Sequence, residues 1–370
     1  MIRLGLVGAG RMGISHLSIA GAHPSVEIAA VCENAGPVIS ALRSYKTYHC
    51  LKSYERLLAL DGLDAVLIAT PTSSHGPMVR SALEANLHVF VEKPFCLDPE
   101  DGADLVALAE SKGLINQVGY HNRFVATFQE AKRLIEAGAL SDIYHIHGEA
   151  YGQVVTQSKS GSWRFKSTKE GGCLLDYASH VIDLMNFLLG PPSNVSGTVL
   201  QSIFSESVED AVYSSFFYDG GRTGRISVNW SDRTYRKMST KVSVLAKNAK
   251  MVVDRQELKI YLAEARPDLG LEQGWNTRNI TALTKPVWFY LRGEEYSAQI
   301  DYFASAIKEK NQNNINSFRN ALECDRVIAK LRQNGRQSDA EPSGDPVTAA
   351  PRKRTPGWKS WFFPFRSFGE

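Results

Sequence analysis

The first 33 residues constrain the fold more than any other stretch of the chain. The apolar run from Ile2 to Val7 has the length and branching of a buried strand, and a G-x-G-x-x-G turn follows it directly. A helix-length segment comes next, and a second apolar run, 26–32, ends at Glu33. This order of strand, glycine turn, helix, strand and acid predicts a βαβ unit that binds a dinucleotide. The turn residues expected to contact the dinucleotide are Gly8, Gly10, Arg11, Met12 and Gly13.

The glycines of this turn and Glu33 each have a physical reason for their position. Gly8 allows the tight turn, Gly10 lets the backbone approach a pyrophosphate, and Gly13 lets the helix pack closely on the strand. Glu33 is placed to accept hydrogen bonds from the hydroxyls of the adenine ribose. Because its carboxylate would repel a 2′-phosphate and no arginine follows before Arg43, NAD is favoured over NADP. Flavin proteins share the fingerprint, so the motif indicates a dinucleotide before it indicates nicotinamide.

Composition excludes several other classes. A chain of 370 residues with 43% hydrophobic and 22% charged residues is typical of a soluble globular protein. No signal peptide or membrane-spanning stretch is recognisable, so a cytoplasmic location is expected. The five cysteines are odd in number and lack C-x-x-C spacing, which indicates neither a disulfide framework nor a metal site. Most of the net charge of +3 comes from residues 351–370, so a nucleic-acid partner is not expected.

Strands and helices continue to alternate as far as about residue 121. This pattern predicts a doubly wound parallel sheet, and we assign 1–121 to an NAD-binding domain of the Rossmann type. Ligands of such sheets bind beyond the carboxyl ends of the strands. The loops that follow the predicted strands 65–69 and 88–91 should therefore lie beside the cofactor. The candidate cofactor contacts in these loops are Thr70, Pro71, His75, Glu92 and Lys93.

Residues 122–332 have a different pattern. Predicted helices at 124–137 and 173–189 are combined with a series of short strands joined by polar turns, which predicts an α+β domain with a large, mostly antiparallel open sheet. This domain is expected to bind substrate and to mediate oligomerisation. The predicted strands are 143–151, 195–202, 211–218, 223–230, 241–246, 251–254 and 258–262.

The end of the chain divides into three parts. Residues 264–294 show no clear periodicity but contain several aromatic residues, and loops of this length are usually functional. Two amphipathic helices are predicted at 296–309 and 317–331, and they could pack back on the first domain. Residues 333–370 are rich in Ser, Pro, Gly and charge, and they are predicted to form a flexible tail.

Three residues have the chemistry for catalysis at an alcohol. Lys93 lies at a predicted strand end before Pro94, which restricts its backbone and can point its side chain into the cofactor cleft. Asp176 and His180 are four residues apart, so on a helix they share one face. The histidine has a suitable pKa for taking a hydroxyl proton, while the aspartate could orient the imidazole or bind a neighbouring hydroxyl.

Together these motifs resemble the glucose-fructose oxidoreductase / inositol dehydrogenase family, also called Gfo/Idh/MocA. The resemblance covers about residues 1–332. It includes the glycine turn, Ala69-Thr70-Pro71 with His75, Glu92-Lys93-Pro94, Trp163-Arg164, and the glycine-led segment from Asp176 through His180 to Asp183.

The resemblance implies a function and further site residues. It implies that Lys93, Asp176 and His180 act at the substrate hydroxyl, with the histidine as acid/base, and that a homodimer or homotetramer forms through the second-domain sheet. It also implies a substrate cleft lined by Tyr120, Arg123, Trp163 and Arg164. The sequence departs from the usual motifs of this family at two places. The lead-in is Glu170-Gly171-Gly172-Cys173, where three glycines are usual, and residue 33 is Glu33, where aspartate is commoner.

The leading hypothesis is an NAD-dependent dehydrogenase of a sugar, a cyclitol or a sugar nucleotide. A catalytically silent NAD-binding sensor or assembly protein is a second hypothesis, and an oxidoreductase that recycles a bound flavin or NADP is a third. Separately, the bases of 351–370 are interleaved with Trp and Phe, which predicts either a weak, reversible membrane contact or docking on a protein partner. Co-sedimentation with anionic vesicles distinguishes these two roles of the tail.

Overall fold

The computed structural model describes residues 1–45, 48–154, 171–206 and 208–340. Its first sheet is six-stranded and parallel, in the order β3-β2-β1-β4-β5-β6. This order is that of a dinucleotide-binding Rossmann domain, so the predicted α/β fold is confirmed. The elements are β1 Ile2–Val7, α1 Arg11–Ala22, β2 Val26–Cys32, α2 Gly36–Tyr45, β3 Cys50–Leu51, α3 Tyr54–Leu58, β4 Ala65–Ile68, α4 His75–Glu84, β5 His88–Val91, α5 Pro99–Ser111 and β6 Asn116–Val118.

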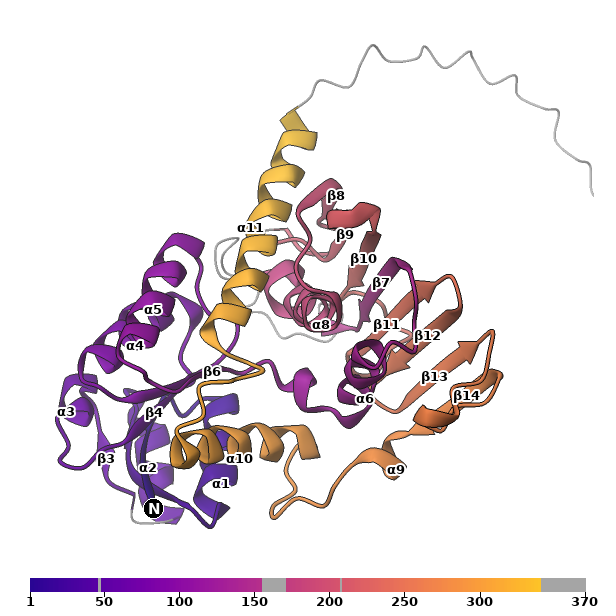
Figure 1. The fold of residues 1–370 in the computed structure, drawn as a ribbon. Helices are drawn as coiled ribbons and strands as arrows, with labels where there is room; N and C mark the ends of the chain where they lie inside the picture. The colour runs from indigo at the N-terminus through magenta and orange to yellow at the C-terminus, as the bar shows by residue number, and fades with distance from the viewer. Residues whose placement is uncertain (46–47, 155–170, 207, 341–370) are drawn as a thin grey trace, which may run out of the picture.

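The second sheet is eight-stranded and lies beside the first domain (Figure 1). Its order is β14-β13-β12-β11-β7-β10-β9-β8, and all neighbours are antiparallel except β7 and β10. The predicted large, mostly antiparallel sheet is therefore confirmed. Its elements are α6 Ala126–Glu136, β7 Ile143–Tyr151, α8 Ser179–Leu189, β8 Asn194–Gln201, β9 Ala211–Phe217, β10 Thr223–Asn229, β11 Ser239–Ala246, β12 Ala249–Asp254, β13 Glu257–Leu262, β14 Gly274–Asn279 and α9 Ile280–Leu283.

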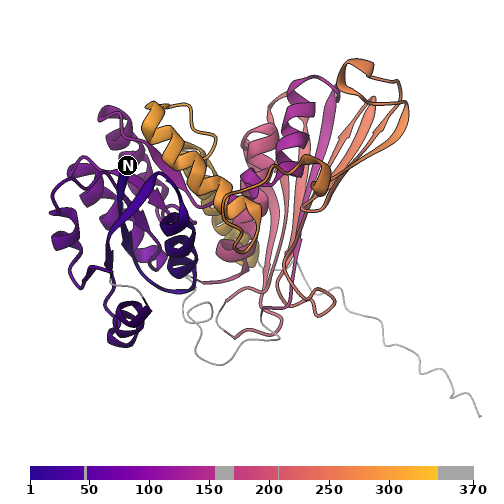
Figure 2. The ribbon, with the colours of Figure 1, turned by 90° about the horizontal axis from the view of Figure 1, so that it is seen from below.

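Helices cover this sheet on the side that faces the first domain. Helix α8 packs on β7 and β11, and α6 packs on β12 and β13. Side chains alternate between buried and more exposed along β7, β10 and β11, as expected when one face of a sheet is covered. Figure 2 shows that no described helix lies on the opposite face.

The last two helices join the domains. Helix α10 (Glu294–Glu309) places Ile300 and Phe303 in the same apolar core as Leu4 and Leu6 of β1, so it completes the first domain. Helix α11 (Phe318–Ala340) runs between α5 of the first domain and α8 of the second (Figure 1). Both helices therefore pack against the first domain, as their sequences allowed.

Helix α11 corrects the predicted start of the tail at residue 333. The helix continues to Ala340 because it packs along β8, where Thr198 N donates to Asn334 Oδ1 at 2.8 Å and Gly335 lies against Leu200. Polar composition indicated a tail, but contacts with a distant strand keep the segment helical.

The segment 264–294 also contains a strand that its sequence did not indicate. Strand β14 pairs with β13 at the edge of the sheet, and its side chains alternate between half-buried and exposed. A strand without a buried face lacks the hydrophobic alternation that predicts strands. Among the described helices, none is long and apolar enough to cross a membrane.

Candidate active site

The glycine turn after β1 has the geometry that its sequence requires. Gly8 has φ +85°, and a Cβ there would lie 2.7 Å from Ala69 O. A Cβ on Gly13 would lie 1.8 Å from Gly8 O, so only glycine permits this approach of α1 to the turn. A Cβ on Gly10, in contrast, would meet nothing within 4 Å. The turn thus leaves open space where a pyrophosphate would approach the start of α1, and the residues present fit a dinucleotide.

Glu33 is held beside this turn by backbone donors. Its Oε2 accepts from Ala9 N at 2.7 Å, and its Oε1 accepts from Asn34 N and Ala35 N at 2.8 Å each. Burial works in the opposite direction, but these three N–H groups outweigh it and lower the pKa of Glu33. Its carboxylate is therefore ionised and fixed, as hydrogen bonding to ribose hydroxyls requires.

His75 connects the two loops expected beside the cofactor. Its Nδ1 lies 2.9 Å from Pro94 O and its Nε2 lies 3.0 Å from Thr70 O, and the side chain is buried. Burial lowers the pKa of His75, so the ring is neutral and donates to only one of these two carbonyl oxygens. The side chain supports the two loops, and contact of His75 with the cofactor stays a prediction. Earlier in the same loop, Thr70 is half-buried and Pro71 is exposed.

Glu92 is likewise a support for its loop. It is buried, with Oε1 2.6 Å from His16 Nε2, and its Oε2 accepts from Lys93 N at 3.2 Å. Burial raises the pKa of Glu92, but the contact with His16 and the charge of Lys93 outweigh it and lower that pKa. Its carboxylate therefore holds α1 and the backbone of Lys93, and contact of Glu92 with the cofactor stays a prediction.

Lys93 reaches across to the second domain. Its Nζ donates to Asp176 Oδ1 at 2.9 Å and to Asp176 O at 3.1 Å. The two side chains are 14% and 12% exposed, so the ion pair is largely shielded from solvent. Asp176 lies in a π-helical turn, Leu174–Ala178, and such turns are frequent at functional sites.

His180 lies one turn further along, at the start of α8, and is buried. Its Nδ1 has no hydrogen-bond partner among the described residues, so Asp176 does not orient the ring through that atom. Burial, reinforced by the charges of Lys93 and Arg255, holds the pKa of His180 well below its ordinary value. The imidazole is therefore neutral near pH 7 and able to accept a proton.

Comparison with known proteins places this arrangement in a family. Residues 2–120 match the model of an oxidoreductase family with an NAD-binding Rossmann fold, and residues 128–252 match the GFO/IDH/MocA C-terminal domain. The chain belongs to the Gfo/Idh/MocA family. The resemblance recognised in the sequence, and the NAD-binding fold that it implied, are thereby confirmed.

Two curated relatives and one solved structure illustrate the range of this family. The chain is 31% identical to the rhizopine catabolism protein MocA of Rhizobium meliloti over 61% of this chain and 70% of that protein. It is 28% identical to the NAD-dependent scyllo-inositol 2-dehydrogenase of Bacillus subtilis over 62% and 67%. Levoglucosan dehydrogenase in complex with NADH and levoglucosan has the same fold, with a TM-score of 0.80, 21% identity, and coverage of 91% and 97%.

This Gfo/Idh/MocA protein brings a second histidine to the site that sequence reasoning missed. The ring centroid of His121 lies 5.0 Å from that of His180, and the rings meet edge to face at 68°. His121 follows β6 by three residues. The rule that pointed to Thr70 and Lys93, a polar residue just beyond the carboxyl end of a strand, would also have found it.

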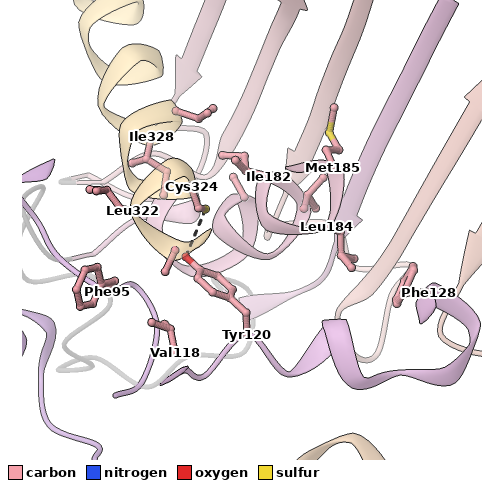
Figure 3. Close-up of a cluster of buried hydrophobic side chains, with 14 of the residues drawn as sticks. Phe95, Val118, Tyr120, Phe128, Ile182, Leu184, Met185, Leu322, Cys324 and Ile328 are labelled. Atoms are coloured by element: carbon pink, nitrogen blue, oxygen red, sulfur yellow. Dashed lines mark hydrogen bonds between the residues drawn. The ribbon is translucent and has the colours of Figure 1, made fainter. Parts of the chain in front are cut away.

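Two residues predicted to contact substrate lie in the core. Tyr120 is fully buried, and its hydroxyl donates to Cys324 Sγ at 3.3 Å among the apolar side chains shown in Figure 3. Arg123 is buried and donates to Asp183 through Nε and Nη2 at 2.7–3.0 Å. Both polar groups are engaged inside the core, which favours a role in supporting the fold, and contact of Tyr120 and Arg123 with substrate stays a prediction.

The glycine-led segment before α8 is held by Glu209. Gly172 has φ +95°, and a Cβ there would clash with the Glu209 carboxylate. Cys173, the residue after this glycine, is buried and donates its N–H to Glu209 O at 2.9 Å. Trp163, Arg164 and Glu170 lie outside the described residues, as does the basic and aromatic stretch 351–370.

Proposed function

We propose that this protein is an NAD-dependent dehydrogenase that oxidises a secondary alcohol of a sugar, a cyclitol or a sugar nucleotide. The observation that carries this proposal is the Lys93–Asp176 ion pair beside a neutral, buried His180, positioned between the dinucleotide turn and the second domain. A cation that can bind an alkoxide and a base that can take a proton are the two groups that alcohol oxidation requires.

Three residues of the chain have separate roles at the substrate hydroxyl. Lys93 Nζ polarises the substrate oxygen, Asp176 holds Lys93 in place, and His180 accepts the hydroxyl proton. When bound, the nicotinamide ring takes up the hydride at C4. The alcohol carbon thus loses a hydride and the alcohol oxygen loses a proton, which gives a ketone. In the reverse direction, His180 returns the proton to the carbonyl oxygen.

The named relatives support a polyhydroxylated substrate. One is a dehydrogenase of an inositol, and a protein of the same fold was solved with NADH and levoglucosan. A silent NAD-binding sensor is disfavoured by the intact set of Lys93, Asp176 and His180, because a protein that only binds NAD needs neither a cation nor a base for a substrate hydroxyl.

A substrate panel tests the proposal. Polyols, free sugars and sugar nucleotides are each incubated with NAD and with NADP, and the reduced-nicotinamide absorbance is followed. We expect turnover of at least one member with NAD, and slower turnover with NADP because Glu33 disfavours a 2′-phosphate. Absence of turnover across the panel, with NAD binding intact, would favour the sensor. Cofactor absorbance in the protein as purified would favour a recycled cofactor.

We also propose that copies of the chain associate through the uncovered face of the second sheet. Apolar and aromatic side chains on this face are exposed or half-buried, including Phe217, Val252, Tyr261 and Trp275, of which Trp275 is 60% exposed. Exposed apolar groups on one sheet face favour an interface. We expect a dimer or tetramer in sedimentation velocity, and dissociation in the Tyr261→Lys/Trp275→Lys variant. A wild-type monomer at micromolar concentration would contradict this proposal.

A further inference from the structure

His180 is oriented by packing rather than by a hydrogen bond to Nδ1. That nitrogen is buried without a partner, and two aromatic rings meet the imidazole edge to face. The centroid of His121 lies at 5.0 Å and that of Tyr120 at 6.1 Å. Tyr120 is part of the core. His121 is therefore the ring outside that core that can set the position of His180.

His121 is itself held by residues from two other elements. Its ring stacks on Tyr296 of α10 with centroids 4.5 Å apart and an interplanar angle of 19°. Arg255, in the turn between β12 and β13, donates through Nη1 to His121 Nε2 at 3.3 Å. A guanidinium can only donate, so Nε2 is an acceptor and His121 is neutral, with its proton on Nδ1.

Arg255 links this arrangement to the first domain. It pairs with Glu295 in the first turn of α10, and the Glu295 side chain is buried. Helix α10 packs on the first domain, whereas Arg255 lies in a turn between two strands of the second sheet, so the ion pair joins the two domains.

We propose that His121 is a positioning residue for His180, and that the Arg255–Glu295 pair controls the placement and the charge of the His180 imidazole from across the domain boundary. This inference rests on the proposed role of His180 as the base. It adds to that role the residues that hold the base in position.

The charges around His180 determine in which direction its pKa should change when the Arg255 charge is removed. Lys93 and Arg255 both oppose its protonation, and Asp176 is paired with Lys93. Arg292 acts on His121, Glu295 is paired with Arg255, and Asp183 is paired with Arg123. Removal of the Arg255 charge should therefore raise the pKa of His180.

The first experiment measures the effect of the Arg255 charge on the titration of His180. The Arg255→Gln and Arg255→Lys variants are compared by histidine ¹³C NMR titration of the free protein, with His180→Gln to assign the signal, and by the pH profile of kcat/KM. We expect the His180 midpoint and the acid limb of kcat/KM to move to higher pH in Arg255→Gln and to stay near wild type in Arg255→Lys. The NMR titration needs no substrate, so it tests this inference even if the proposed function fails.

A matched control separates electrostatics from general disruption. Arg278 pairs with Glu130 inside the second domain, with side chains 24% and 9% exposed against 32% and 6% for Arg255 and Glu295. Arg278→Gln should leave both midpoints unchanged. Equal midpoints in wild type, Arg255→Gln and Arg278→Gln would overturn the electrostatic part of the inference.

The second experiment tests positioning. His121→Ala should lower kcat by up to about 100-fold with little change in NAD affinity, because a small misplacement of a catalytic group is costly. His121→Phe keeps a ring against His180 and Tyr296, so it should recover part of that loss. Unchanged kcat in a folded His121→Ala protein, or a Phe variant no better than the Ala variant, would overturn the positioning role.

Discussion

His180→Ala is expected to lower kcat by about 10²–10⁴-fold while NAD affinity stays close to wild type, because a general acid/base typically contributes this factor. The dinucleotide contacts predicted here come from the glycine turn and Glu33 of the first domain, whereas His180 begins α8 of the second. Loss of the imidazole removes the proton acceptor but leaves the Lys93–Asp176 pair in place. Steady-state kinetics together with NAD titration by protein fluorescence measure the two effects separately.

The pH dependence of the wild-type reaction gives an independent check. The pKa of His180 lies well below 6.5, chiefly because burial disfavours the imidazolium. The base therefore stays deprotonated below pH 6.5, and the acid limb of kcat/KM for oxidation should fall there. His145→Ala serves as the control, since His145 lies on β7 and its Nδ1 contacts Thr223.

Near-normal turnover in folded His180→Ala would remove His180 from the mechanism.

Local patterns predicted the elements around the site better than they predicted which side chains face it. The βαβ unit, the loop of Lys93 and the spacing of Asp176 and His180 follow from short stretches of sequence, and all of them lie at the boundary between the domains. The sequence could not decide between substrate contact and fold support for Tyr120 and Arg123, because their partners, Cys324 and Asp183, lie about 60 to 200 residues away.

His75 and Glu92 show the same limit at closer range. Both lie in the predicted loops, but a loop at a strand end contains residues that bind ligand and residues that hold the loop, and sequence does not separate them. Burial and the partners of each polar atom favour a supporting role for both: Thr70 O and Pro94 O for the histidine, His16 for the carboxylate. His121 was missed although the strand-end rule points to it, and its contact with Arg255, more than a hundred residues away, is visible only in the structure.

The second large effect is expected in stability rather than in catalysis. The Arg123 and Asp183 side chains are 4% and 1% exposed, and removal of one partner would leave a buried charge without compensation. Arg123→Met should therefore lower the free energy of unfolding by about 3–5 kcal/mol. Arg123→Met/Asp183→Leu should recover most of that loss, because two apolar side chains of suitable volume replace an ion pair at little cost.

Urea unfolding followed by circular dichroism measures these differences, with Arg319→Met as the control. Arg319 pairs with Glu110 at the surface, where both side chains are largely exposed, so its replacement should change the free energy of unfolding by at most about 1 kcal/mol. The same proteins decide between the two roles of Arg123. If Arg123 only supports the fold, the fraction of Arg123→Met that remains folded should keep the wild-type KM for substrate. If the stability of Arg123→Met were unchanged and its KM raised, Arg123 would be returned to the substrate cleft, and the buried ion pair would be the wrong description of its role.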